Sequence, residues 1–140
     1  MKLKIKKIRE GATVPSFVHH DDAGMDFFAA ETVTVAPGGI AKIPSGLSLE
    51  IPKGYVGLCW DKSGLSMNFG IKVMGGVIDS GFRGEFMMGV INLSNVPYTF
   101  EKGHKVLQML IQKVERPKIV ETKELAKSKR GKKGFGSSGK

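Results

Sequence analysis

The sequence predicts a single all-β domain of short strands, and three observations support this fold class. Apolar residues alternate with polar ones over several short stretches, which is the pattern of half-buried strands. The 140 residues include 19 glycines and 6 prolines, which leave little room for a long helix. Turn residues recur at intervals of about 8–12 residues, a spacing typical of a β-sandwich, jelly roll or barrel.

The turn residues divide the chain into the expected elements. Alternating or continuous apolar runs predict strands at 33–35, 47–51, 56–60, 86–93 and 106–111. Helical periodicity is weak, and only residues 121–130 could form a helix, with Leu125 as their single large apolar side chain. After residue 120 the composition becomes polar and rich in glycine. We therefore expect a β-domain over residues 1–120 and a flexible basic tail over residues 121–140.

The net charge is concentrated at the two ends of the chain. Lys and Arg number 22 and Asp and Glu number 13, which gives a formal net charge of +9. Residues 1–10 carry +4 and residues 121–140 carry +5, so residues 11–120 are neutral. Nucleic-acid-binding domains usually place positive charge on a folded face, so no specific nucleic acid binding is expected. The basic tail then either keeps the protein soluble or closes over a polyanion.

Composition excludes several further classes of protein. Cys59 is the single cysteine, so an internal disulfide and a cysteine-based metal site are ruled out. Its position in an alternating strand indicates a small core residue. No apolar run approaches the ~20 residues that span a bilayer, and the first residues lack the apolar stretch of a signal peptide. We expect a cytoplasmic protein with no membrane partner.

Two glycine-rich turns are the strongest candidates for chemistry. Asp79 follows two apolar residues within the turn 75–84. A carboxylate there could act as a general base on a water molecule, or could only hydrogen-bond its own turn. Lys62, Ser63 and Gly64 could present a cation, a hydroxyl and a backbone N–H to a phosphate, or could form an ordinary turn.

Two other patterns resemble ligand sites without meeting their requirements. Residues 134–140 fit part of a P-loop, but no buried strand precedes them and no helix follows Lys140. His19 and His20 precede two aspartates, yet adjacent residues of an extended segment point to opposite faces. Only His104 is available elsewhere to complete a metal cluster. We expect no zinc site.

Five segments together resemble the five motifs of the trimeric dUTPases, in the same order and at suitable separations. These segments are 23–26, 62–66, 76–84, 102–108 and 130–139. The third and the fifth are the most specific. The resemblance implies a distorted jelly-roll barrel with a flexible C-terminal tail, assembled as a homotrimer whose active sites are shared between subunits.

The same resemblance implies an activity. A dUTP diphosphatase hydrolyses dUTP to dUMP and pyrophosphate with Mg²⁺ as cofactor, by attack of an activated water on the α-phosphorus. The reaction supplies dUMP for thymidylate synthesis and keeps uracil out of DNA. In this family the tail of one chain closes over a site that other chains form.

Each matching residue receives an implied role from the resemblance. Asp79 matches the carboxylate that activates the water, and Asp26 matches a carboxylate near the hydrated metal ion. Phe82 matches the aromatic ring beneath the deoxyribose, which leaves no room for a 2′-hydroxyl. The remaining substrate-binding matches are Lys62, Ser63, Gly64, Val77, Ile78, Met87, Gln108, Arg130, Phe135, Gly136, Ser137 and Ser138.

Four positions depart from the usual family pattern. Lys62 stands where arginine is usual, and the planar fork of arginine is lost with it. Phe82 replaces a tyrosine, His104 an aspartate and Asp61 a proline. None of these changes removes the base, the metal-side carboxylate or the tail, so we expect an active enzyme.

Two alternative functions compete with this one. The dCTP deaminases and the bifunctional deaminase-diphosphatases share the fold, but they carry a catalytic glutamate ten residues after the aspartate that matches Asp79. Gly89 stands at that position here. A non-catalytic β-module that binds nucleic acid through its basic ends would leave Asp79 and Phe135 without a purpose.

Overall fold

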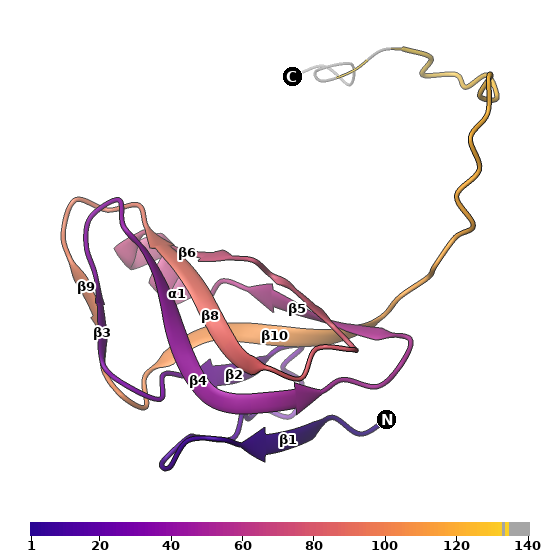
Figure 1. Ribbon diagram of the computed structural model, residues 1–140. Helices are drawn as coiled ribbons and strands as arrows, with labels where there is room; N and C mark the ends of the chain where they lie inside the picture. Colours follow the sequence, from indigo (N-terminus) through magenta and orange to yellow (C-terminus); the bar gives the residue numbers. More distant parts are fainter. Residues whose placement is uncertain (133, 135–140) are drawn as a thin grey trace.

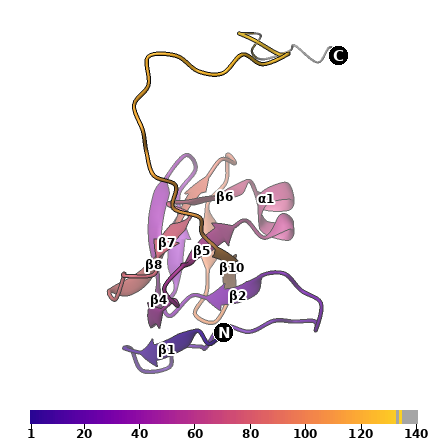
Figure 2. The same ribbon diagram turned by 90° about the vertical axis from the view of Figure 1, so that its right-hand side faces the viewer.

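The described residues of the computed structural model, 1–132 and 134, form two antiparallel four-stranded sheets with the core between them (Figures 1 and 2). The first sheet has the order β1 (Lys4–Lys7), β4 (Ile40–Glu50), β8 (Glu85–Asn92) and β6 (Ile71–Met74). The second has the order β2 (Met25–Phe28), β10 (Lys105–Lys113), β5 (Tyr55–Trp60) and β7 (Val77–Asp79). A small third sheet pairs β3 (Val33–Val35) with β9 (Tyr98–Phe100).

The core forms because strands of both sheets turn every second side chain inward. Phe27 of β2 meets Phe86 of β8 edge to face, with ring centroids 5.0 Å apart, and joins the two sheets. Leu107 and Met109 of β10 are fully buried on the same inner face as Phe27. The expectation of an all-β, jelly-roll-like fold is therefore confirmed, although β1 and β6 remain as edges and the barrel is not closed.

A junction of three segments fixes the start of β8. The ladder between β4 and β8 shifts register between Pro44 and Ser48, and Gly46 lies in this irregularity. The backbone N–H of Gly46 donates to Glu85 Oε1 at 3.1 Å, and the backbone N–H of Arg9 donates to the Gly46 carbonyl. The Arg9 guanidinium holds the Glu85 carboxylate at two points, at 2.7 and 2.8 Å. Glu85 thereby ties β8 to β4 and to the N-terminal segment.

The sequence-based placement of a possible helix at residues 121–130 is wrong. Residues 121–130 form no helix, and Leu125 there is 87% exposed, so no surface is available to stabilise an amphipathic turn. Within the described residues the helix is α1 (Ser63–Phe69), which ends at Gly70 in the left-handed conformation with a φ of 68°. A helix of seven residues is too short to show a period of 3.6.

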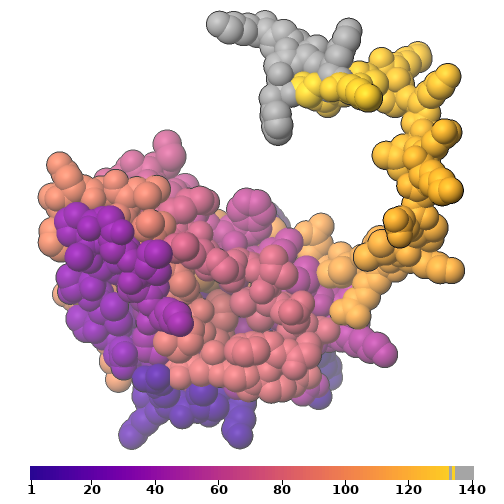
Figure 3. Space-filling view, turned by 45° about the horizontal axis from the view of Figure 1, so that its top comes forward, coloured from indigo at the N-terminus to yellow at the C-terminus, as the bar shows by residue number. Residues whose placement is uncertain are grey.

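The five predicted strands all exist, and the tail leaves the body at the end of β10. Sequence reasoning missed β1, β2, β6, β7 and β9, which have only three or four residues each. Val114 still donates its backbone N–H to the Gly54 carbonyl at 2.9 Å. From residue 117 the described tail extends away from the two sheets (Figures 1 and 3). No helix of the described chain is long and apolar enough to cross a membrane.

We predict that Gly46→Ala lowers the free energy of unfolding more than Gly38→Ala does. Both glycines have a positive φ, of 69° and 67°, so each alanine costs roughly 1–2 kcal/mol of backbone strain. A Cβ at Gly46 would also lie 2.7 Å from the Cβ of Ala12, whereas a Cβ at Gly38 meets nothing within 4 Å. Urea unfolding of the two variants measures the difference, and equal losses would contradict a steric role for Gly46.

Candidate active site

A polar pocket of about 380 Å³ opens at one end of the second sheet. The segment before β2, the start of β10 and the start of α1 form its walls. Five residues predicted for phosphate or metal contacts line it together: Asp26, Lys62, Ser63, Gly64 and Gln108. Three separate sequence motifs therefore meet in one pocket, hereafter the lysine pocket.

Asp26 is the buried charge around which the lysine pocket is organised. The residue is 3% exposed, and Lys62 Nζ lies 2.5 Å from its Oδ1. Lys105 Nζ lies 2.8 Å from its Oδ2, close enough for an ion pair. Oδ2 is itself buried, and the Lys105 ammonium is the group that compensates it among the described residues.

The two lysines keep Asp26 ionised. Burial raises the pKa of a carboxyl group, because the charged form loses its hydration. For Asp26 the contacts with Lys105 and Lys62 outweigh this effect and hold its pKa below the usual value. The pocket therefore presents two ammonium groups that share one carboxylate.

Gln108 is held at the pocket wall by its neighbours. It lies opposite Asp26 in the ladder between β10 and β2, and its Nε2 donates to the Asp61 carbonyl at 2.8 Å. A Cβ at Gly24 would come within 2.7 Å of Gln108 Oε1, so a side chain there would displace the Gln108 amide. The Asp61 carboxylate accepts from the backbone N–H of Val73 at 2.6 Å and ties the end of β5 to β6.

A second, mainly apolar pocket of about 440 Å³ lies against β8. Its walls include Ile40, Met74, Ile78, Phe82, Phe86 and Met87. The backbone N–H of Phe82 donates to the Asp79 carbonyl at 3.1 Å and closes a tight turn. The Phe82 ring covers Gly84, where a Cβ would lie 2.9 Å from the ring, so a side chain there would displace it. This apolar pocket can enclose a flat ring or a sugar.

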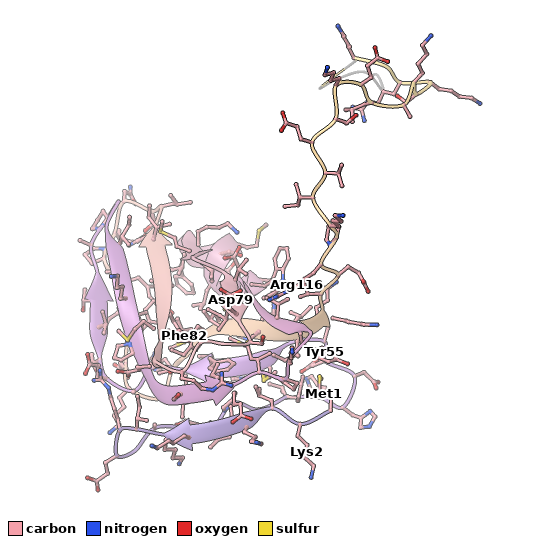
Figure 4. All side chains as sticks on the ribbon, turned by 45° about the vertical axis from the view of Figure 1, so that its right-hand side comes forward. Met1, Lys2, Tyr55, Asp79, Phe82 and Arg116 are labelled. Carbon is pink, nitrogen blue, oxygen red and sulfur yellow. The ribbon has the colours of Figure 1, made fainter. Side chains whose placement is uncertain are left out.

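Asp79 lies far from the lysine pocket of its own chain. It ends β7 opposite Val56 of β5, and its carboxylate makes no hydrogen bond or ion pair with the described residues. Lys62 follows Val56 by six residues, which at ~3.3 Å per residue separates Asp79 from Lys62 by roughly 15–20 Å. Figure 4 shows Asp79 toward the end of the molecule near Tyr55 and Arg116, where the tail departs.

An apolar strip connects these two distant ends on the outer face of the second sheet. Register places Asp26 and Gln108 at one end of this face and Asp79 at the other. Between them the same face carries Val56, Leu58, Trp60, Val77 and Leu110. Trp60 is 54% and Val77 65% exposed, so none of the described residues covers the apolar strip. Val77 lies on this strip and in neither of the two pockets.

The structure groups most predicted site residues and adds one. Ile78, Phe82 and Met87 line the apolar pocket, while Arg130 lies in the extended tail. The predicted Phe135, Gly136, Ser137 and Ser138 lie outside the described residues. Sequence reasoning missed Lys105, which contacts Asp26 and lines the lysine pocket. Its position within the fourth motif is the signal that could have identified it.

The histidines belong to turns. His19 donates its backbone N–H to Asp22 Oδ2 at 2.8 Å, and His104 Nδ1 accepts from the backbone N–H of Glu101 at 3.3 Å. In the part of the chain that the structure describes, no group of three His, Cys, Asp or Glu side chains could hold a metal ion.

Comparisons with known proteins agree on one family. A profile of the dUTPase family matches residues 10–139. The deoxyuridine 5′-triphosphate nucleotidohydrolase of Clostridium tetani is 41% identical, covering 99% of this chain and 97% of that protein. The protein of the same name from Caldanaerobacter subterraneus is 38% identical, covering 98% and 97%.

Solved structures give the same result. The dUTPase of Staphylococcus bacteriophage 80alpha with dUpNHpp has a TM-score of 0.92 at 31% identity, covering 99% of this chain and 98% of that chain. A mutant dUTPase from phage phi11 of S. aureus, which reveals the coordination of a structural Mg(II) ion, has a TM-score of 0.82 at 27% identity, covering 89% and 98%.

We predict that Cys59 of the folded protein resists alkylation at pH 8. Cys59 lies opposite Met109 in the ladder between β5 and β10, and burial raises the pKa of its thiol to about 12. The thiolate is the reactive form, so almost none is present at pH 8. Iodoacetamide labelling followed by mass spectrometry, with and without urea, measures this. Rapid labelling of the native protein would contradict it.

Proposed function

This chain belongs to the dUTPase family, and from that premise we propose how its own residues carry out the family's reaction. The protein is an enzyme that hydrolyses dUTP to dUMP and pyrophosphate. The roles are assigned from two different pockets on one chain, one apolar and one lined by lysines. The apolar pocket suits the nucleoside of a nucleotide, and the lysine pocket suits its phosphates.

The apolar pocket is the proposed site of the nucleoside. Ile78 and Met87 line it and supply apolar contacts to the uracil ring and the sugar. Val77 points to the opposite face of β7, and its role in substrate binding is proposed from the sequence match alone. Phe82, 42% exposed, packs beneath the deoxyribose. A 2′-hydroxyl would meet this ring and lose its hydrogen bonds to water, which favours dUTP over UTP.

The lysine pocket is the proposed site of the phosphates. Lys62 supplies positive charge, Ser63 and Gly64 supply a hydroxyl and a backbone N–H, and Gln108 supplies an amide. A triphosphate carries about four negative charges, so cations that lie ready in the pocket stabilise it without reorganisation.

Mg²⁺ is the proposed cofactor, and the residues present fit a hydrated ion. Asp26 supplies the carboxylate at the base of the pocket, and its Oδ2, which Lys105 alone approaches among the described residues, would face a water of the hydrated ion. A single carboxylate does not form a complete site, which suits Mg²⁺ because this ion keeps several waters and binds phosphates. When bound, the ion neutralises charge that develops on the phosphate oxygens.

Asp79 is the proposed general base. Its carboxylate takes a proton from a water molecule as the water oxygen forms a bond to the α-phosphorus. The bond from the α-phosphorus to the bridging oxygen breaks, and pyrophosphate leaves with the electron pair. Alignment and neutralisation of charge supply most of the acceleration in phosphoryl transfer.

A homotrimer with shared sites is the proposed assembly. Asp79 and Lys62 of one chain lie roughly 15–20 Å apart along the sheet, too far to act on one phosphate group. Trp60 and Val77 leave the apolar strip between them exposed. A second copy of the chain on this strip would bury it and bring Asp79 of one subunit to the lysine pocket of the next.

The tail is the proposed cover of the site. We propose that the domain of residues 1–120 carries the two pockets and that residues 121–140 close over a bound nucleotide. Arg130 is the phosphate contact of the tail's described part. Phe135, Gly136, Ser137 and Ser138 are assigned to stacking on uracil and wrapping the phosphates by sequence match alone. A cytoplasmic location completes the proposal.

Pyrophosphate release over dUTP, dCTP, dTTP and UTP with Mg²⁺ tests the function. Release from dUTP alone is expected. Ammonia release from dCTP would favour the deaminase alternative, which Gly89 disfavours because it supplies no carboxylate where the deaminases carry their catalytic glutamate. Salt-dependent binding to any polyanion without turnover would favour the nucleic-acid-binding module.

We predict that Asp79→Asn abolishes turnover and leaves the affinity for dUTP within about tenfold of the wild-type value. An amide cannot accept a proton from water, so the loss falls on kcat. Steady-state kinetics and calorimetric binding of a non-hydrolysable analogue separate the two effects. A near-normal kcat in a folded variant would remove Asp79 from the role of base.

We predict that mixing two impaired variants restores activity. Asp79→Asn chains keep Lys62, and Lys62→Met chains keep Asp79, so a shared site can draw an intact residue from each. After subunit exchange, pyrophosphate release should exceed the sum of the two unmixed samples. A mixture that is no more active than this sum would mean that both residues act within one chain.

A further inference from the structure

The net charge of the lysine pocket depends on Lys105, to which no role has been assigned. Two acids, Asp22 and Asp26, line the pocket with two lysines, Lys62 and Lys105. The four charges cancel. Without the charge of Lys105, the other three charged side chains would give the pocket a formal charge of −1. Such a pocket would repel a triphosphate, since like charges a few ångströms apart are costly.

The geometry turns both ammonium groups toward the pocket. Lys62 and Lys105 contact different oxygens of the same carboxylate, at 2.5 and 2.8 Å. The side chain of Asp26 is 4% exposed, whereas those of Lys62 and Lys105 are 26% and 40% exposed. The carboxylate therefore lies at the base, and the two cations lie between it and the solvent.

Each ammonium group retains hydrogen-bonding capacity. A lysine has three N–H donors. Lys62 directs one of them to Asp26, and Lys105 uses at most one in its ion pair with the same carboxylate. Both lysines can therefore contact another anion without leaving Asp26, which remains compensated throughout.

We propose that Lys105 is a substrate-binding residue that contacts the triphosphate of the nucleotide together with Lys62. Asp26 is the positioning residue that holds the two ammonium groups as a pair. This inference rests on the proposed function of the lysine pocket. Two point charges fixed on one carboxylate offer the paired contact to phosphate that a single arginine would supply through its planar fork.

Affinity for two nucleotides tests the proposal. Calorimetry gives the Kd of dUMP and of an imido analogue of dUTP for wild type, Lys105→Met and Lys105→Arg. Lys105→Met should weaken analogue binding about ten- to hundredfold, the range of a lost charge-assisted contact. Lys105→Arg should recover most of it. Affinity for dUMP, which lacks the two outer phosphates, should change by less than about threefold.

Lys113→Met is the matched control. Lys113 lies on the same strand, its side chain is 75% exposed, and its ion-pair partner among the described residues is Glu115, at 4.0 Å. The Lys113→Met substitution removes one positive charge without touching the pocket, so analogue affinity should stay near the wild-type value. An equal loss in both variants would attribute the effect to overall charge and overturn the proposal.

A double variant covers the case in which Lys105→Met fails to fold. Asp26→Asn removes the buried negative charge. When it is combined with Lys105→Met, no buried carboxylate is left without its cation. With EDTA and with Mg²⁺, this double variant should bind the analogue at least about tenfold more weakly than Asp26→Asn alone. Equal affinities would show that Lys105 serves only Asp26.

The proposal and the proposed function fail separately. If wild-type protein releases no pyrophosphate from dUTP, the function fails whatever the binding data show. If turnover is normal and Lys105→Met binds the analogue like wild type, only the role of Lys105 is overturned.

Discussion

Strand β10 imposes the constraint on which both the core and the site depend. It lies between β2 and β5, and its side chains alternate between two faces. Leu107 and Met109 enter the core, while Gln108 between them faces the lysine pocket beside Asp26. A slip of one residue would exchange these faces, burying the glutamine and exposing two core residues. Stability therefore selects the same register that assembles the site.

The strands that the sequence predicts best are those with long, buried apolar runs. β8 and β10 have eight and nine residues, and their hydrophobic content identifies them without any partner. β7 has three residues and exists because it pairs with β5, a contact that the local sequence does not encode. α1 depends in the same way on its setting, since none of its residues is buried and Gly70 ends it.

The site follows the same division. Motif order identifies the residue types, because Asp26, Lys62 and Gln108 each stand in a recognisable segment. Their meeting in one pocket requires the ladders between β2, β10 and β5. The contact of Lys105 with Asp26 depends on a register shift between Lys105 and Leu107, which sends Lys105 to the same side as Gln108. No local pattern encodes that irregularity.

In the proposed assembly, closure of the site by the extended tail depends on the effective concentration of the tail. Residues 117–129 span at most roughly 47 Å, enough for a tail to reach from its own subunit to a neighbour in that assembly. A tethered segment of this kind acts at a local concentration set by its length, on the millimolar scale for short linkers. That concentration does not change when the assembled protein is diluted. It vanishes only when subunits separate, so specific activity should stay constant on dilution until dissociation begins and then fall steeply.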